Sequence, residues 1–256
     1  MGLYTHAYQL MTSPAVLLGQ ALDRVLFPTM ALVQLEPARL ARAYRSGAAV
    51  CALLVMPASI VLAILAPEIV LVLLGPAWAG VVTPFRILAL GMLFRTSYKL
   101  GDSVARATGA VYDRAWRQAV YALAVVVGAW IGQHWGLAGV ALGVLAALAI
   151  NFALMAQLSL RLTGVRWSEL GAAHLPALAL TVALGAETWA LAAWLRGLQT
   201  APLVLLAEVA LFSTGAGVLL CWGLPPLFLG RDARTLLRAM VALVAGRARL
   251  EGRPSV

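Results

Sequence analysis

The chain has 256 residues and a formal net charge of +9, and 62% of its residues are hydrophobic whereas only 11% are charged. A soluble globular domain carries about 25% charged residues, so this composition excludes an ordinary soluble domain and predicts an integral membrane protein. The positive charge does not indicate nucleic-acid binding, because the arginines lie in short loops between apolar runs, which is typical of membrane topology signals.

Seven apolar segments approach or exceed the length of about 20 residues that a transmembrane helix needs. They predict an all-α, polytopic transmembrane helix bundle of about seven spans. In chain order the predicted spans are residues 4–33, 46–74, 81–110, 118–134, 137–158, 173–194 and 203–227.

Prolines interrupt the first two predicted spans. Pro14 and Pro28 lie in the first span, and Pro57 and Pro67 lie in the second. A proline inside a helix removes a backbone donor and kinks or breaks the helix. Such breaks are tolerated in a membrane only where neighbouring groups or water satisfy the freed carbonyls.

The third predicted span carries a charged stripe formed by Arg95, Lys99, Asp102 and Arg106. At about 100° per residue these four side chains fall within roughly 60° of one another on a helix. Charge on one face of a membrane helix is costly in lipid and should therefore face protein, water or an anionic ligand. We predict that Arg95, Lys99 and Asp102 line a cationic cavity, with Asp102 paired to Lys99 or Arg106 when the cavity is empty. The alternative is that Asp102 and Arg106 reach water at the end of the span.

Other charged residues in the spans have less defined roles. Asp23 and Arg24 are adjacent and point about 100° apart, so they cannot pair along one face. We interpret one as a cavity residue and the other as a contact to a neighbouring helix or the interface; purely structural roles stay open. Glu68, Glu187 and Glu208 lie toward the outer ends of their spans. They either bind a coupling cation or proton, or they cap helices locally or lie exposed at the interface.

Glycines recur with small-xxx-small spacing in the fourth and fifth spans, which predicts close helix packing. They are glycines 128, 132, 136, 139 and 143.

The arginines also predict the orientation in the membrane. Most of them fall on alternate connections and therefore on one face: Arg39, Arg42, Arg45, Arg106, Arg114, Arg117, Arg161 and Arg166. The other face has little more than Arg86 and Arg196. The positive-inside rule assigns the basic face to the cytoplasm, and seven spans then place the C-terminus there too. Residues 229–256 form a basic tail that we expect along the membrane surface or in the cytosol.

Four stretches carry a family resemblance. They are GLYTHAYQLMTSPAVLLGQALDRVLFPTMALVQLEPARLARAYR, LLGPAWAGVVTPFRILAL, ARATGA and HWGLAGVALG. The first has an opening G-x-Y-x-x-A-Y, a late F-P and a basic stretch before the next span. In this order the four stretches resemble the C-terminal half of the Wzx-type polysaccharide flippases, which are members of the multidrug/oligosaccharidyl-lipid/polysaccharide exporter superfamily. The resemblance covers about Gly2 to Leu160.

The resemblance implies one lobe of a two-lobe transporter that opens alternately to either side of the bacterial inner membrane. Its cargo would be undecaprenyl-diphosphate-linked oligosaccharide for cell-surface polysaccharides such as lipopolysaccharide or exopolysaccharide. Residues 1–160 would form the core of the lobe, and 161–228 would add two helices. A complete member has an N-terminal lobe that is absent here, so that lobe or a polysaccharide polymerase is an expected protein partner beside membrane lipids.

The sequence gives no indication of an enzyme. It has no Gly-rich phosphate loop followed by Lys-Ser/Thr and no cluster with metal-ligand spacing, so we expect neither a cofactor nor a metal. Two other functions stay open. One is a cation-coupled multidrug exporter, which the net positive stripe disfavours; the other is a non-transporting membrane scaffold subunit.

Overall fold

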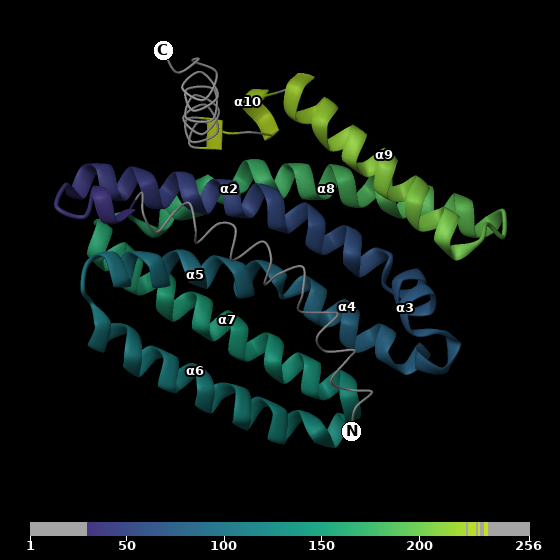
Figure 1. The fold of residues 1–256 in the computed structure, drawn as a ribbon, viewed down its shortest axis with the longest axis horizontal. Helices are drawn as coiled ribbons and strands as arrows, with labels where there is room; N and C mark the ends of the chain where they lie inside the picture. Colours follow the sequence, from purple (N-terminus) through teal and green to yellow (C-terminus); the bar gives the residue numbers. More distant parts are fainter. Residues whose placement is uncertain (1–29, 224, 229, 231–232, 235–256) are drawn as a thin grey trace, which may run out of the picture.

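The computed structural model describes residues 30–223, 225–228, 230, 233 and 234, and every element in this part of the chain is helical. The predicted all-α fold is therefore confirmed (Figure 1). The elements are α2 (Pro37–Ile64), α3 (Ala66–Leu74), η1 (Pro76–Val81), α4 (Val82–Leu90), α5 (Met92–Ala107), α6 (Val111–Gly132), η2 (Gln133–Trp135), α7 (Gly136–Thr163), α8 (Trp167–Gly197), α9 (Pro202–Gly223) and α10 (Pro225–Phe228). The first predicted span falls almost entirely outside the described residues.

Five helical stretches of the described chain are long and apolar enough to cross a membrane. They are Pro37–Ile64, Pro76–Ala107, Val111–Thr163, Trp167–Gly197 and Pro202–Gly223. The third stretch turns back at η2 and so contains two antiparallel helices, α6 and α7, which lie side by side in Figure 1. The predicted spans from the second to the seventh therefore each correspond to helical segments.

Apolar side chains cover the outside of this bundle. On α9, Leu211 is 74% exposed and Trp222 is 81% exposed, while Leu205 and Val209 are buried against neighbouring helices. A helix that is apolar on every side is typical of a membrane span, because lipid rather than water surrounds the outward side chains. The exposed surface thus supports a multi-pass membrane protein.

The second predicted span is divided into two helices. Helix α2 ends at Ile64 and α3 begins at Ala66, with Leu65 between them. The physical reason is Pro67, which has no N–H and so cannot donate the usual helical hydrogen bond to the carbonyl of Ala63. The third predicted span is likewise divided at Gly91 into α4 and α5.

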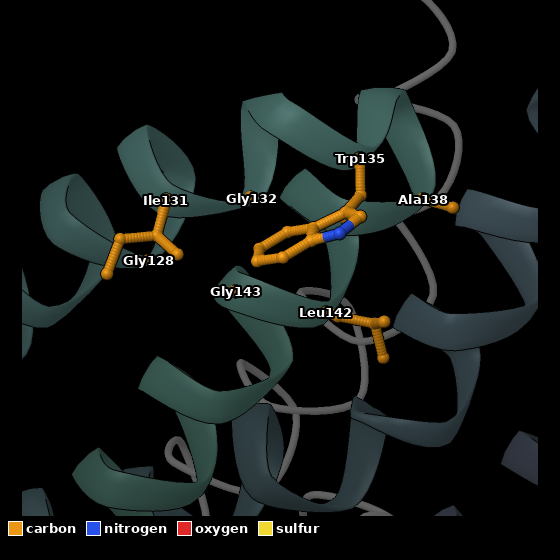
Figure 2. A pocket seen from close by; sticks show the side chains of 8 residues that line it. Gly128, Ile131, Gly132, Trp135, Ala138, Leu142 and Gly143 are labelled. Atoms are coloured by element: carbon orange, nitrogen blue, oxygen red, sulfur yellow. The ribbon is translucent and has the colours of Figure 1, made fainter.

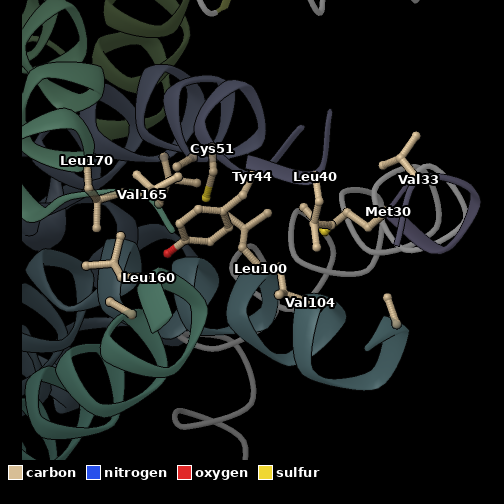
Figure 3. Close-up of a cluster of buried hydrophobic side chains, with 14 of the residues drawn as sticks. Met30, Val33, Leu40, Tyr44, Cys51, Leu100, Val104, Leu160, Val165 and Leu170 are labelled. Carbon is tan, nitrogen blue, oxygen red and sulfur yellow. The ribbon is translucent and has the colours of Figure 1, made fainter. Parts of the chain in front are cut away.

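The central core places α5 between α2 and α7 (Figure 3). Tyr44 and Cys51 of α2 meet Leu100 and Val104 of α5, and Leu160 of α7 closes the same cluster. Leu100 and Val104 are one helical turn apart, so they define a single packed face of α5. This face fixes the direction in which the charged stripe of α5 points.

The helix ends fall into two groups (Figure 1). The start of α2, the α5–α6 junction and the α7–α8 junction lie together at one end of the bundle, which we call the basic end. Arg45 of α2 and Glu169 of α8 form an ion pair of 3.2 Å there. The α3–α4, α6–α7 and α8–α9 junctions lie at the other end, which we call the opposite end. The arginines predicted on the cytoplasmic face therefore gather at one end, as predicted, but the prediction that they lie in loops is wrong. The helices extend past the apolar spans, so all of these arginines except Arg166 lie in the end turns of α2, α5, α6 and α7.

Candidate functional site

The charged stripe lies on one face of α5, as the spacing predicted. Arg95, Lys99 and Asp102 are half-buried, and Arg106 is exposed. The helical positions place the stripe on the side of α5 opposite the packed face of Leu100 and Val104. The stripe therefore points away from the core that α5 shares with α2 and α7.

Asp102 is held by two arginines at the basic end. Its carboxylate pairs with Arg106 one turn further along α5, at 3.2 Å between Oδ2 and Nε. Its second oxygen, Oδ1, accepts a hydrogen bond from Nε of Arg114 at the start of α6. The predicted pairing of Asp102 with Arg106 is therefore confirmed. Arg114 is a partner that sequence reasoning missed, because periodicity within one helix does not indicate contacts from the next.

Lys99 is in a different situation from Asp102. No residue that the structure describes forms a hydrogen bond or ion pair with its ammonium group. Its neighbour on the stripe one turn earlier is Arg95, so two positive groups follow each other on the same face. A half-buried ammonium in a spanning helix requires water or an anion beside it. This part of the stripe is chemically suited to receive phosphate oxygens.

Arg117 is the largest fully buried polar side chain of the described residues, although the sequence predicts it in a connection. Its Nε donates to the carbonyl of Leu154 on α7 at 3.2 Å, and its Nη1 donates to the carbonyl of Asp113 at 2.6 Å. The guanidinium also lies 4.4 Å from the ring centroid of Trp116. These contacts join α6 to α7 and give Arg117 a structural role.

Of the three glutamates predicted in the spans, Glu68 and Glu187 have defined partners. Glu68 pairs with Arg196, and Oε2 of Glu187 accepts a hydrogen bond from Ser213 of α9 at 2.9 Å. Thr188 joins the second group through a 2.9 Å hydrogen bond with Ser213. Helices α8 and α9 are thus linked by a polar cluster inside the membrane-spanning part, and a coupling role for these carboxylates stays a prediction.

Asp23, Arg24 and Glu208 are three further charged residues of the predicted spans. Asp23 and Arg24 lie outside the described residues, so the structure does not test their role. Glu208 is half-buried on α9. In the described part of the chain, no group of three or more His, Cys, Asp or Glu residues is arranged to hold a metal ion.

Four of the five glycines predicted to pack closely do so at the α6–α7 hairpin. The exception is Gly136, which has a positive φ of 69° and where an added Cβ would meet no atom within 4 Å. A Cβ added to Gly128 would lie 2.7 Å from the carbonyl oxygen of Gly143, and Gly132 meets Gly139 in the same way. Beside this seam lies a cavity of about 580 Å³ (Figure 2). Its lining is Gly128, Ile131, Gly132, Trp135, Ala138, Gly139, Leu142 and Gly143. The lining has no charged side chain, so this cavity lacks the groups that bind phosphate.

About the first third of the chain resembles a family of known proteins. Residues 1–83 match a family model described as polysaccharide biosynthesis protein, and this range includes α2 and α3. No curated protein and no solved structure matches the chain. The helical membrane fold and the family match together support a membrane protein of polysaccharide biosynthesis.

Proposed function

We propose that this chain is one lobe of a flippase that exports lipid-linked oligosaccharide across the bacterial inner membrane. The proposal is supported by the polysaccharide-biosynthesis match over residues 1–83 and by the helices that can span a membrane. The cargo is undecaprenyl-diphosphate-linked oligosaccharide. An N-terminal lobe or a polysaccharide polymerase supplies the remaining protein surface, and the C-terminus lies in the cytoplasm.

The observation that carries the proposal is Lys99, whose ammonium has no partner among the described residues and follows Arg95 on one face of α5. A diphosphate loses its hydration when it enters a medium of low dielectric, and paired cations offset that loss. Arginine presents a planar fork to phosphate oxygens, and lysine presents a compact charge. In the mechanism, these two groups hold the diphosphate while the two lobes open alternately to the two leaflets.

Asp102 has a positioning role in this mechanism. Its ion pair with Arg114 ties α5 to α6 at the basic end, and its pair with Arg106 lies within α5. Asp23 and Arg24 stay predicted cavity residues of the preceding span.

The test replaces Arg95 and Lys99 by alanine on the chromosome, so that every natural partner of the chain stays available. We expect surface glycan to be lost while the amount of protein in the membrane is unchanged. The matched control is Arg42→Ala with Arg161→Ala, which also removes two positive charges but from exposed positions at the basic end. Normal export from the Arg95→Ala/Lys99→Ala strain would contradict the proposal.

The same strains separate this function from the two alternatives. A multidrug exporter would alter drug susceptibility and leave surface glycan intact. A scaffold subunit would co-purify with polymerase or ligase partners, and glycan export would not depend on the charge of the stripe.

A further inference from the structure

At the opposite end of the bundle, the structure brings two distant arginines to one pocket. Arg86 lies on α4, and Arg196 is the penultimate residue of α8. Both line a cavity of about 330 Å³ together with Ile60, Ala63, Ile64, Leu90 and Trp189. We call this cavity the arginine pocket. The sequence indicated only that these arginines share a face of the membrane.

The break between α2 and α3 holds both guanidinium groups in place. Pro67 leaves the carbonyl of Ala63 without a helical donor, and Nε of Arg86 donates to that oxygen at 3.0 Å. Nη2 of Arg196 donates to the next carbonyl, that of Ile64, at 3.2 Å. The carbonyl end of a helix carries a partial negative charge, so α2 attracts both cations.

The two arginines differ in how many of their hydrogen-bond donors remain free. Arg196 is engaged by Glu68 through two contacts, Nε–Oε1 at 2.8 Å and Nη2–Oε2 at 3.0 Å. The Nη1 and Nη2 groups of Arg86 have no hydrogen-bond partner among the described residues, and the side chain is exposed. The pocket therefore keeps one net positive charge. The Nη1 and Nη2 groups of Arg86 are free to donate hydrogen bonds, while its Nε is held by the carbonyl of Ala63.

Trp189 indicates what kind of anion fits. It lies seven residues before Arg196, which is about 10 Å deeper along α8 and on the same face. Trp189 is 64% exposed. Tryptophan favours the membrane interface, where its ring packs on apolar groups. A ligand that spans the pocket would thus place an anion at Arg86 and an apolar portion at Trp189.

We propose that the arginine pocket binds the phosphate of a membrane amphiphile in the leaflet at this end of the bundle. The guanidinium of Arg86 donates to the phosphate oxygens, and the indole of Trp189 covers the adjoining apolar part. This inference rests on the pocket alone and does not require that the chain transports a lipid.

The test measures lipid binding to the purified full chain in detergent by native mass spectrometry. Short-chain phosphatidic acid is compared with diacylglycerol of the same chain length, which lacks the phosphate. We expect phosphatidic acid to bind and Arg86→Gln to weaken its binding by about tenfold, the size of a lost hydrogen bond to a charged group. The control Arg161→Gln, which removes an exposed arginine at the basic end, should leave the affinity unchanged.

Further variants separate binding from folding. Arg86→Lys keeps the charge and should retain most of the affinity, and Trp189→Ala should weaken binding although no charge is lost. The proposal would be overturned if diacylglycerol bound as tightly as phosphatidic acid. It would also be overturned if Arg161→Gln weakened lipid binding as much as Arg86→Gln, or if both Arg86→Gln and Trp189→Ala left lipid binding unchanged. Displacement of the lipid by inorganic phosphate at equal concentration would identify a soluble phosphate as the ligand, and would overturn the assignment to an amphiphile.

Discussion

Asp102 and Lys99 lie on the same face of α5, but their surroundings give them opposite roles. Asp102 has two arginine partners, whereas Lys99 has none among the described residues. A carboxylate with two charged partners stabilises the packing of the helices that carry them. An ammonium without a partner contributes nothing comparable and remains available for a ligand. The stripe therefore separates into a structural part at the basic end and a part suited to binding.

The structural role of Asp102 predicts a stability effect. Its side chain is 15% exposed, and Asp102→Asn removes the negative charge that faces Arg106 and Arg114. We expect the free energy of unfolding to fall by about 1–3 kcal/mol, between the values for exposed and buried ion pairs. The measurement is thermal unfolding of the purified chain in detergent.

The control for Asp102→Asn is Glu36→Gln. Glu36 pairs with Arg39 at 2.7 Å, but both side chains are more than half exposed. Exposed pairs contribute about 0–1 kcal/mol, so Glu36→Gln should change the melting temperature little. Equal effects of the two variants would mean that Asp102 does not join α5 to α6.

At the scale of the elements, the close packing of α6 against α7 depends on glycines, which have no side chain to separate the two helices. A Cβ on Gly143 would meet the backbone of Gly128, which cannot move aside as the tip of a flexible side chain could. We expect Gly143→Ala to separate the two helices at a cost of about 1–3 kcal/mol, the usual penalty for overpacking. Loss of monodisperse protein in size-exclusion chromatography and a lower melting temperature would report the effect.

Gly215 provides a control within α9. A Cβ at this position meets no atom within 4 Å, so Gly215→Ala adds a methyl group without a clash. Alanine also favours the helix by about 1 kcal/mol over glycine. A stable Gly215→Ala beside an unstable Gly143→Ala is the expected result, and equal stability of the two variants would contradict close packing at the hairpin.

The sequence was sufficient to predict the features that depend on spacing within one helix. The spacing of Arg95, Lys99 and Asp102 indicated their common face, and the glycine spacing indicated the close hairpin. Both follow directly from helical periodicity.

Features that depend on distant partners could not be predicted. Pro67 indicated a kink or a break, but the outcome depends on donors that Arg86 and Arg196 bring from other helices. The sequence likewise predicts Arg117 in a connection, whereas α6 already begins at Val111 and the Arg117 guanidinium donates to the carbonyl of Leu154 on α7.

For the whole molecule, the two ends of the bundle predict the orientation in the membrane. The arginines in the end turns of the described helices lie mainly at the basic end, which the positive-inside rule places in the cytoplasm. In a background with Cys51→Ala and Cys221→Ala, we introduce Arg166→Cys at the basic end or Leu198→Cys at the opposite end. Both positions are exposed.

A membrane-impermeant maleimide added to intact spheroplasts should label Leu198→Cys and leave Arg166→Cys unlabelled. Both variants should react once the membrane is permeabilised, which controls for access to the thiol. The reverse pattern would place the basic end outside and contradict the predicted cytoplasmic C-terminus.

The hairpin of α6 and α7 also limits how such a bundle can rearrange. Packed helices slide past one another by switching side-chain rotamers at their interface. At the two glycine pairs, Gly128 with Gly143 and Gly132 with Gly139, there are no rotamers to switch. We therefore expect α6 and α7 to move together as one rigid unit. Any sliding between helices must then occur at interfaces lined by longer side chains. Spin labels on α6 and α7 would keep a constant separation in every state of the protein.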